Sequence, residues 1–311
     1  MHITKAKPDV SVVMSVYNDA DHLRESIDSI LSQEGVDFEF IVVNDGSTDG
    51  SKEILDEYTL KDKRIRVIHQ GNHGLTRALI RGCTEAKGEY IARHDAGDIS
   101  FPSRLGKQLS CLKSHPDATL VSCGTRFVGP GGEHLYDILQ DSEEATSSLK
   151  NLTMKAIRGP SHHGSTFFPR RLYEKVGGYR AAFYFGQDLD LWIRLAEHGT
   201  HYVIPELLYQ ASITAESISS LYRKEQVQLT KLMLEAAAAR RRNMSELHIL
   251  EKAHSIQPNL KRMRSPLAQA KGFYFIGACL RRRGSPKAGF YFKAAIKACP
   301  IHLRSWYRLV F

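Results

Sequence analysis

The chain has 311 residues, of which 42% are hydrophobic and 25% charged, a size and composition that suit one large globular domain with an appendage, or two domains. It has no apolar run of the length that a membrane-spanning helix needs, and its polar start, Met1–Lys7, lacks the apolar stretch of a signal peptide, so we expect a cytosolic protein. Its five cysteines form no CxxC pair, which favours buried free thiols over a metal or disulfide framework.

The balance of charge changes sign near residue 220. The net charge is +9, but the residues from 221 onward contain 19 Lys and Arg against 4 Asp and Glu, which leaves 24 basic and 30 acidic residues in the first 220. Such a shift predicts a boundary between a domain over residues 1–220 and a basic helical region over residues 221–311.

The N-terminal part alternates strand-like and helix-like segments. The apolar, β-branched runs predict four strands, over Val10–Val16, Phe38–Asn44, Ile65–Ile68 and Tyr90–Arg93. Helical spacing of apolar residues predicts three helices between them, beginning near Asp21, Thr48 and Leu75. Because such helices can cross over between parallel strands, the pattern predicts a Rossmann-like, mainly parallel α/β sheet that binds a nucleotide.

The later elements are less regular. The run Gly129–Gly132 predicts a hairpin tip between strands over Leu120–Phe127 and Glu133–Tyr136, and helices are expected over residues 142–156 and 188–197. Beyond Leu221 the composition predicts four or five helices.

Two loops at predicted strand ends carry acidic residues. Asp45 follows a buried strand and precedes a helix, so its carboxylate could accept from a nucleobase N–H at the carboxyl edge of the sheet. A plain turn is the alternative, and a calcium loop does not fit because an EF-hand needs a helix before it. Asp95 and Asp98, three residues apart, could converge on Mg²⁺ or Mn²⁺ and neutralise a leaving diphosphate, the alternative being a solvated acidic loop.

These motifs together resemble the family 2 glycosyltransferases. The resemblance covers residues 9–220 and is carried by Val10–Asn18, Ile30–Gln33, Phe38–Asp49 and Gly88–Leu105. It implies a GT-A fold, a nucleotide-diphosphate sugar donor (most often UDP-linked), a divalent metal (Mn or Mg) and inversion at the anomeric carbon.

The resemblance also implies roles for several residues near the donor. It places Tyr17 and Asp45 at the base and Asp95 at the ribose or the metal. The third position of the usual Asp-Ala-Asp-Asp run is Gly97, so Asp98 becomes the expected metal ligand beside Asp95.

The segment Phe185–Arg194 is similar to the family's Glu-Asp-x-Asp-Leu-Trp segment. It implies that Asp188 is the catalytic base, with Gln187 in place of the usual Glu, and an inverting transfer needs one such carboxylate to take the proton of the acceptor hydroxyl. Trp192 either stacks on a sugar or packs beneath the site.

Two further residues are expected near the donor. The resemblance places His163 near the donor phosphates or the acceptor, while Asn72 either lines the nucleotide pocket or caps a helix. The family's frequent Tyr-Arg pair is Tyr209-Gln210 here, which removes one cation from the phosphate side.

The C-terminal region is helical and basic. Residues 269–300 look like a single tetratricopeptide-type repeat, which must pack on neighbouring elements because one repeat cannot bury its own face. Its cationic clusters suit either an anionic membrane surface or a plain solvated face. Nucleic acid is not an expected partner, because no stacking platform or nucleic-acid motif is present.

The sequence therefore predicts an inverting glycosyltransferase that moves a sugar, most simply from a UDP-sugar, to a saccharide or lipid-linked saccharide acceptor. The expected setting is bacterial surface polysaccharide synthesis, in the cytoplasm at the inner face of the membrane. A sugar nucleotidyltransferase is one alternative, although the Gly-rich phosphate loop that it needs is absent near residues 15–18. An inactive transferase-fold adaptor is the other, suggested by Gly97 and Gln187.

Overall fold

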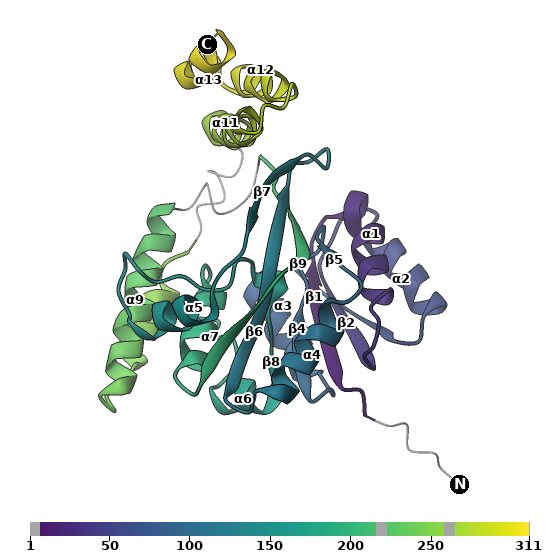
Figure 1. The fold of residues 1–311 in the computed structure, drawn as a ribbon, viewed down its shortest axis with the longest axis vertical. Coiled ribbons are helices and arrows are strands. Elements are labelled where there is room, and N and C mark those ends of the chain that lie inside the picture. The colour runs from purple at the N-terminus through teal and green to yellow at the C-terminus, as the bar shows by residue number, and fades with distance from the viewer. Residues whose placement is uncertain (1–6, 216–222, 258–264, 311) are drawn as a thin grey trace.

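The computed structural model describes residues 7–215, 223–257 and 265–310, which fold around a mixed β-sheet with helices on both faces (Figure 1). The strands are β1 Val10–Val16, β2 Phe38–Asp45, β3 Ile65–Gln70, β4 Tyr90–Arg93, β5 Ile99–Ser100, β6 Ala118–Val128, β7 His134–Ile138, β8 Phe167–Pro169 and β9 Thr200–Ser212. Their order is β3-β2-β1-β4-β8-β6-β9-β5, with β7 paired to β6 outside this path.

The first half of the sheet has the predicted parallel topology. Strands β3, β2, β1 and β4 are all parallel neighbours. The other half is mixed, because β8 runs antiparallel to both β4 and β6 whereas β9 runs parallel to β6. The hairpin of β6 and β7 around residues 129–132 is also confirmed.

Helices cover both faces of the sheet. They are α1 Ala20–Leu31, α2 Ser51–Lys61, α3 Leu75–Thr84, α4 Arg104–Ser114, α5 Ser142–Lys150, α6 Arg170–Lys175 and α7 Gln187–Ala196. The pleat of β1 explains the layers, since Val12 and Met14 pack in the cluster that holds α1, α2 and α4, whereas Val13 packs with α3 and α7. Each such fully buried side chain contributes about 1.5–3 kcal/mol to stability, which is why this run is apolar on both faces.

The basic C-terminal region packs in two places. Helices α9 Arg223–Arg241 and α10 Leu247–His254 join the core on the α3 and α7 side, where α9 contributes Leu229 and Met233. Helices α11 Pro266–Arg282, α12 Ala288–Ala298 and α13 Leu303–Val310 lie beyond β7 in Figure 1, and Leu135 of β7 is buried against α11 and α12.

Helices α11 and α12 pack against each other and against the sheet domain, whereas the tetratricopeptide-like character of residues 269–300 stays a prediction. Tyr291 donates a hydrogen bond to Glu133 (3.0 Å) and Lys287 pairs with the same carboxylate (3.3 Å), so the hairpin tip before β7 anchors α12. None of the helices in the described residues is both long and apolar enough to cross a bilayer.

All five cysteines are free thiols. Four of them are buried as expected, and Cys111 is partly exposed.

Candidate active site

The carboxyl ends of three parallel strands meet at one edge of the sheet. Strands β1 and β2 are in register up to Val16 and Asn44, so the next residues, Tyr17 and Asp45, lie side by side. Strand β4 runs beside β1 on its other side and leads into Asp95. The topology therefore gathers three predicted site residues at the edge where parallel sheets bind ligands.

The Asp45 carboxylate is hydrogen-bonded through both oxygens, whereas the Tyr17 side chain is exposed. Asp45 Oδ1 accepts hydrogen bonds from Gln70 Nε2 (2.7 Å) and the backbone N–H of His73 (2.9 Å), and Oδ2 accepts from the backbone N–H of Gly74 (2.8 Å). Asp45 thus fixes the loop that leads into α3. The Tyr17 side of this pair is open, with 52% of the residue exposed.

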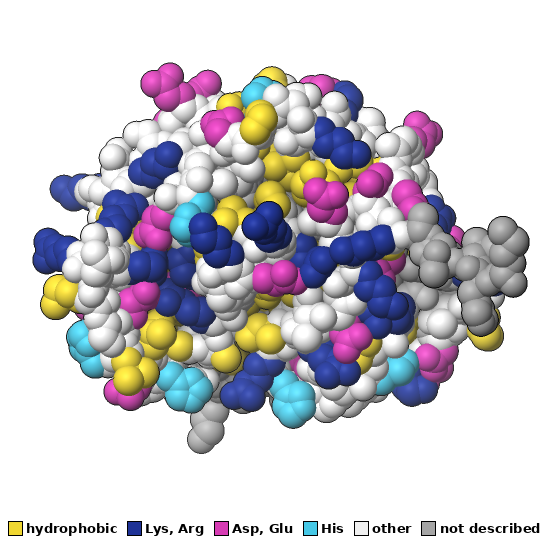
Figure 2. All heavy atoms as spheres, turned by 90° about the horizontal axis from the view of Figure 1, so that it is seen from below, with side chains coloured by type: hydrophobic (Ala, Val, Ile, Leu, Met, Phe, Trp, Pro, Cys, Tyr) yellow, Lys and Arg dark blue, Asp and Glu magenta, His cyan; other side chains and the backbone are white. Residues whose placement is uncertain are grey.

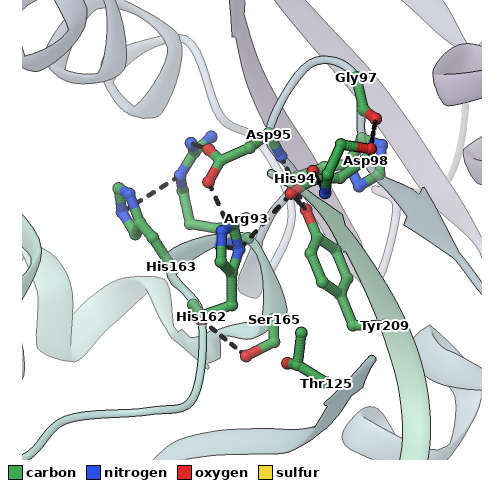
Figure 3. Close-up of polar contacts among 12 residues, drawn as sticks. Arg93, His94, Asp95, Gly97, Asp98, Thr125, His162, His163, Ser165 and Tyr209 are labelled. Carbon is green, nitrogen blue, oxygen red and sulfur yellow. Dashed lines mark hydrogen bonds and ion pairs between the residues drawn. The ribbon is translucent and has the colours of Figure 1, made fainter. Parts of the chain in front are cut away.

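Asp95, Asp98 and His162 form an acidic cluster (Figure 3). Each residue offers one ligand atom, and these atoms lie within 4.8 Å of one another. His162 Nδ1 is 3.5 Å from Asp98 Oδ2 and 3.8 Å from Asp95 Oδ2. The two aspartates follow β4, whereas His162 precedes the short 3-10 helix η1, His163–Ser165, so the cluster joins two distant segments.

Strand β9 supplies two hydrogen-bond donors to Asp98. The Tyr209 hydroxyl donates to Asp98 Oδ2 (2.8 Å), and the backbone N–H of Ser212 donates to Oδ1 (2.9 Å). Burial nevertheless raises the pKa of Asp98 to about 7, which His162 opposes and Asp95 reinforces. A buried acid with no cation of its own gains a proton in this way, and a bound cation would keep it ionised.

Arg93 is a fully buried cation beside the cluster. Its guanidinium donates to Asp95 Oδ1 and to the backbone carbonyl of Val13. Burial by itself raises the pKa of Asp95, but Arg93, His163 and His162 outweigh it and lower the pKa to about 2. Asp95 therefore stays ionised, with Oδ1 bound to Arg93 and Oδ2 turned toward His162.

The acidic cluster fits a divalent cation. Two carboxylate oxygens and an imidazole nitrogen form a mixed donor set that suits Mn²⁺, and Mg²⁺ would use mainly the oxygens. Gly97, between the two aspartates, has φ +81°, a conformation that strains any residue with a Cβ, so the glycine permits the turn that brings Asp95 and Asp98 together. The residues present could thus hold a metal ion.

His163 lies between the cluster and a neighbouring cavity. Its Nε2 is 2.7 Å from the Tyr179 hydroxyl and 3.4 Å from Arg93 Nε. Because a guanidinium can only donate, Nε2 accepts, and the proton of the neutral ring is on Nδ1. Burial and Arg93 lower the pKa of His163 to about 4, whereas Asp95 and Asp188 act in the opposite direction. Both carboxylates therefore lie close enough to act on this one ring.

The cavity beside His163 has a volume of about 390 Å³ and contains Asp188. Its walls are the start of α3, the segment from 181 to 188, and three residues of the basic region. Those three are Gln226, His254 and Gln257. Amide and imidazole groups can both donate and accept hydrogen bonds, which suits a ligand rich in hydroxyl groups.

Asp188 lies in the first turn of α7 at the wall of this cavity. The backbone N–H of Leu189 donates to its Oδ1 (2.8 Å), and the residue is partly exposed. Asp190, two positions on, is buried and paired with Arg180 and Arg194, so its carboxylate is fully engaged in holding α7 in place.

Two predicted residues lie apart from the open part of the site. Trp192 is 5% exposed and packs edge-on against His163 at 6.0 Å between ring centroids, so its burial favours packing over stacking on a sugar. Asn72 is exposed and is not among the residues that line the cavity. The N-cap position of α3 is Gly74, which removes the capping alternative for Asn72.

Three residues of the site had no role in the sequence-based prediction. His162 is adjacent to the predicted His163, and the pair of histidines was the available signal. Arg93 stands two residues before Asp95 and is a buried cation paired with that carboxylate. Tyr209 was noted only for its neighbour, whereas its hydroxyl bonds both Asp98 and the backbone N–H of Asp95.

Comparison with known proteins identifies the family of the N-terminal part. The sequence profile of the family described as "Glycosyl transferase family 2" matches residues 11–177. The chain is 35% identical over 208 residues to EpsE of Bacillus subtilis (strain 168), which carries a glycosyltransferase name, and the match covers 65% of this chain and 72% of EpsE. A glycosyltransferase of Rickettsia bellii is 31% identical over 210 residues, which is 67% of this chain but 30% of that longer relative.

Solved structures share the fold. TarS of S. aureus in complex with UDP-GlcNAc has a TM-score of 0.58 and 17% identity, and covers 93% of this chain and 89% of its own. The mannosyltransferase PcManGT of Pyrobaculum calidifontis, in complex with GDP-Man and Mn²⁺, has a TM-score of 0.56 and 18% identity over 98% and 84% of the two chains. At this identity the likeness shows the fold, which is the expected mixed α/β GT-A type with a helical C-terminal region.

Proposed function

Because the chain belongs to glycosyl transferase family 2, we propose that it transfers a sugar, with inversion, from a UDP-linked donor to a saccharide or lipid-linked saccharide acceptor. The structural neighbours are complexes with UDP-GlcNAc or GDP-Man, which supports a nucleotide-sugar donor. The reaction would serve bacterial surface polysaccharide synthesis at the cytoplasmic face of the membrane.

In this proposal the donor nucleotide binds at the carboxyl edge of the parallel strands. The exposed ring of Tyr17 offers a face for the base, and Asp45, beside it, orders the loop from Gln70 to Gly74. Asn72 belongs to this loop and would border the nucleotide. His163, which donates from Nδ1, would bind an oxygen of the donor or acceptor, and Trp192 keeps its ring in place from beneath.

Asp95 and Asp98, with His162, would hold the divalent metal. When bound there, Mn²⁺ or Mg²⁺ would act as a Lewis acid that stabilises negative charge on the diphosphate leaving group. Arg93 holds Asp95 ionised and oriented, and Tyr209 orients Asp98 with its hydroxyl proton. Arg93 and Tyr209 thus hold two carboxylates in position to bind a cation at one end of the site.

Asp188 would be the catalytic base, on the side of the transferred sugar that faces away from the diphosphate. Its Oδ1 accepts from the Leu189 N–H, which leaves Oδ2 to take the proton of the acceptor hydroxyl as the new bond to the anomeric carbon forms. The hydroxyl oxygen attacks as the bond to the diphosphate breaks, so one carboxylate is sufficient and no covalent sugar–enzyme bond is needed. The cavity beside Asp188 would receive the acceptor.

The single observation that carries the proposal is that His163 connects the two ends of the site. It lines one cavity with Asp188, and its Nε2 is 3.4 Å from the Nε of Arg93, which pairs with Asp95. Replacement of Asp188 by Asn should lower kcat by about 10²–10⁴ while UDP binding is retained, because only the proton acceptor is lost. Turnover would be followed as UDP release from a panel of UDP-sugars with Mn²⁺, and UDP binding by calorimetry.

The control for this experiment is Asp21→Asn, which removes an equal charge from an exposed position in the first turn of α1. We expect the control to keep the turnover of the parent protein. Unchanged turnover in Asp188→Asn would refute the assignment of the base.

The same assay separates the two alternatives. A sugar nucleotidyltransferase would release pyrophosphate from a nucleoside triphosphate and a sugar phosphate, and no UDP from a UDP-sugar. An inactive adaptor would bind UDP yet release none from any donor, in both the parent chain and the variant.

A further inference from the structure

The outer end of the C-terminal helices exposes a cluster of large apolar side chains. Ile301 is 82% exposed, Leu303 77%, Tyr307 63% and Trp306 47%, although these four residues lie within two turns of chain. Such groups are usually scattered over the surface of a soluble protein, and their concentration marks an interaction surface. We refer to Ile301, Leu303, Trp306 and Tyr307 as the apolar ridge.

The apolar ridge lies on the outer side of α13 and of the turn before it. On the inner side, His302 of that turn and Ser305 of α13 are buried and bonded to each other (His302 Nδ1 to Ser305 Oγ, 2.7 Å). The His302 ring also packs on Tyr274 of α11, which fixes the orientation of α13. Leu303 and Tyr307 are one turn apart on the outer side, and Figure 1 shows α13 beyond α11 on the side away from the sheet.

The surroundings of the apolar ridge carry charge of one sign. The sequence has no Asp or Glu after Glu251, whereas residues 265–309 include nine Lys and Arg, all of them exposed. The opposite end of the molecule differs, because in Figure 2 Lys and Arg side chains are interspersed with Asp and Glu. A partner of this end must therefore be anionic.

Arg304 and Arg308 flank the apolar ridge in a geometry that suits phosphate. Together with Leu303, Tyr307 and Tyr274 they line a shallow groove of about 360 Å³. Guanidinium groups bind phosphate oxygens through paired N–H donors, and the leucine and tyrosine side chains offer apolar surface next to them. The groove thus combines the two chemistries of a phospholipid at a bilayer surface.

We propose that α13 and the turn before it dock on the surface of an anionic lipid bilayer. Leu303, Trp306 and Ile301 enter the interfacial region, where aromatic and aliphatic side chains are favoured, while Arg304 and Arg308 contact lipid phosphates. The other exposed cations of α11 and α12 add longer-range attraction to the negative surface. This inference rests on the proposed function only in that docking would bring the cavity with Asp188 near a lipid-linked acceptor.

A second copy of the chain fits this surface less well. Two such ends would bring many cations together with no acidic residue between them, and like charges in an interface are destabilising. The bilayer supplies the missing negative charge and an apolar layer at once.

The test is sedimentation of the full chain with vesicles, in the absence of donor and acceptor. We expect binding to vesicles of phosphatidylcholine mixed with phosphatidylglycerol, little binding to phosphatidylcholine alone, and weaker binding at high salt because the attraction between exposed charges is screened. Equal binding to both vesicles, or none to either, would overturn the proposal.

Two double variants separate charge from apolar contact. Arg304→Gln with Arg308→Gln should weaken binding by about 30-fold, since each cation near an anionic surface contributes roughly fivefold. Ile301→Ser with Leu303→Ser should also weaken it, and circular dichroism and the melting temperature would show that both variants fold. The control is Lys63→Gln with Lys175→Gln, the same loss of charge at exposed positions elsewhere, which should bind as the parent does.

Tryptophan fluorescence tests which surface is in contact. The chain has two tryptophans, so Trp192→Phe leaves Trp306 as the reporter. On anionic vesicles its emission should shift to the blue and be quenched by brominated acyl chains. Binding without a shift or quenching would overturn the proposal, as would concentration-dependent dimerisation that Ile301→Ser with Leu303→Ser abolishes while vesicle binding persists. Release of UDP from a UDP-sugar without vesicles tests the proposed function separately.

Discussion

At the scale of single residues, Arg93 and His162 face different oxygens of the Asp95 carboxylate. Asp95 presents Oδ1 to Arg93 and Oδ2 to His162, so one residue connects a permanent internal cation with the position where a metal ion could bind. The arrangement keeps Asp95 ionised at any physiological pH, because the pKa is lowered to about 2.

Replacement of His162 by Ala should weaken Mn²⁺ binding by at least about tenfold, since even loss of an outer-shell partner of a metal ligand typically costs 10–100-fold. The measurement is calorimetric titration of UDP at several Mn²⁺ concentrations. His134→Ala, at a partly exposed ring paired with Asp137, is the matched control and should keep the parent affinity. An unchanged dependence on Mn²⁺ in His162→Ala would exclude the ring from the metal site.

His201 should make the fold sensitive to acid. It is fully buried, its Nε2 is bonded to Ser122 Oγ (2.8 Å), and burial lowers its pKa to about 3. Because the unfolded chain binds this proton from about pH 6.5, the free energy of unfolding must fall as the pH falls from there toward 3. His201→Gln should lack this loss, so that its stability falls by about 3 kcal/mol less than the parent's between pH 6.5 and pH 4. The measurement is urea unfolding of both proteins across this pH range. An equal loss of stability in His201→Gln and in the parent would contradict the prediction.

The sequence places Asp95 and Asp98 on a loop at a strand end, and the structure brings them together with His162. The role expected for Asp188 came from the family resemblance and stays a prediction, and no local pattern pointed to the partners of these carboxylates. Tyr209 reaches Asp98 only because β9 runs beside β5, and no local pattern contains that pairing.

At the scale of elements, α9 and α10 line the candidate site as well as contributing to the core. Gln226 of α9 and His254, the last residue of α10, line the cavity with Asp188 although both lie outside the region that the family profile matches. Residues beyond the matched region thus form one wall of this cavity.

Gln226→Ala and His254→Ala should each raise the KM for the acceptor by about 2- to 10-fold, the effect of one lost hydrogen bond, with kcat and donor KM nearly unchanged. The assay is transfer to the acceptor at saturating donor. Lys252→Ala, on the exposed side of α10, is the control. A change confined to the donor KM would assign the wall to the nucleotide instead.

Sequence patterns predicted best those elements whose apolar residues follow one regular spacing. Strands β1 to β4 are apolar runs between helices of helical spacing, and all four lie where expected within a few residues. Strand β9 was not predicted, because Pro205 and Glu206 interrupt its pattern, and its register with β6 shifts beside them. Strand β5 has two residues and is too short to give a pattern, whereas β8, Phe167–Pro169, overlaps the strand-like run of residues 165–168.

At the scale of the whole molecule, we propose that residues 1–220 are the catalytic domain and that α9 and α10, at the start of the basic region 221–311, complete its core. Buried side chains of α9 include Leu229, Leu232 and Met233, and each such side chain contributes about 1.5–3 kcal/mol. Removing α9 would therefore cost a free energy comparable with the 5–15 kcal/mol by which a typical domain is stable.

A chain that ends after Gln257 should therefore unfold cooperatively and keep UDP binding, whereas a chain that ends after residue 220 should aggregate or remain unfolded. Chemical denaturation followed by circular dichroism distinguishes them. A well-folded protein from residues 1–220 would show that α9 and α10 are dispensable.

The unit of α7 and β9 links the two ends of the site through one stretch of chain. Asp188 lies in the first turn of α7, and β9, the next element, carries the Tyr209 hydroxyl that donates to Asp98. The turn between them contains Gly199, where a Cβ would come within 2.2 Å of the Asp117 carbonyl oxygen. A bulkier residue there must shift α7 relative to β9, so we expect it to change the spacing between Asp188 and the cluster of Asp95, Asp98 and His162 from a turn that contacts neither.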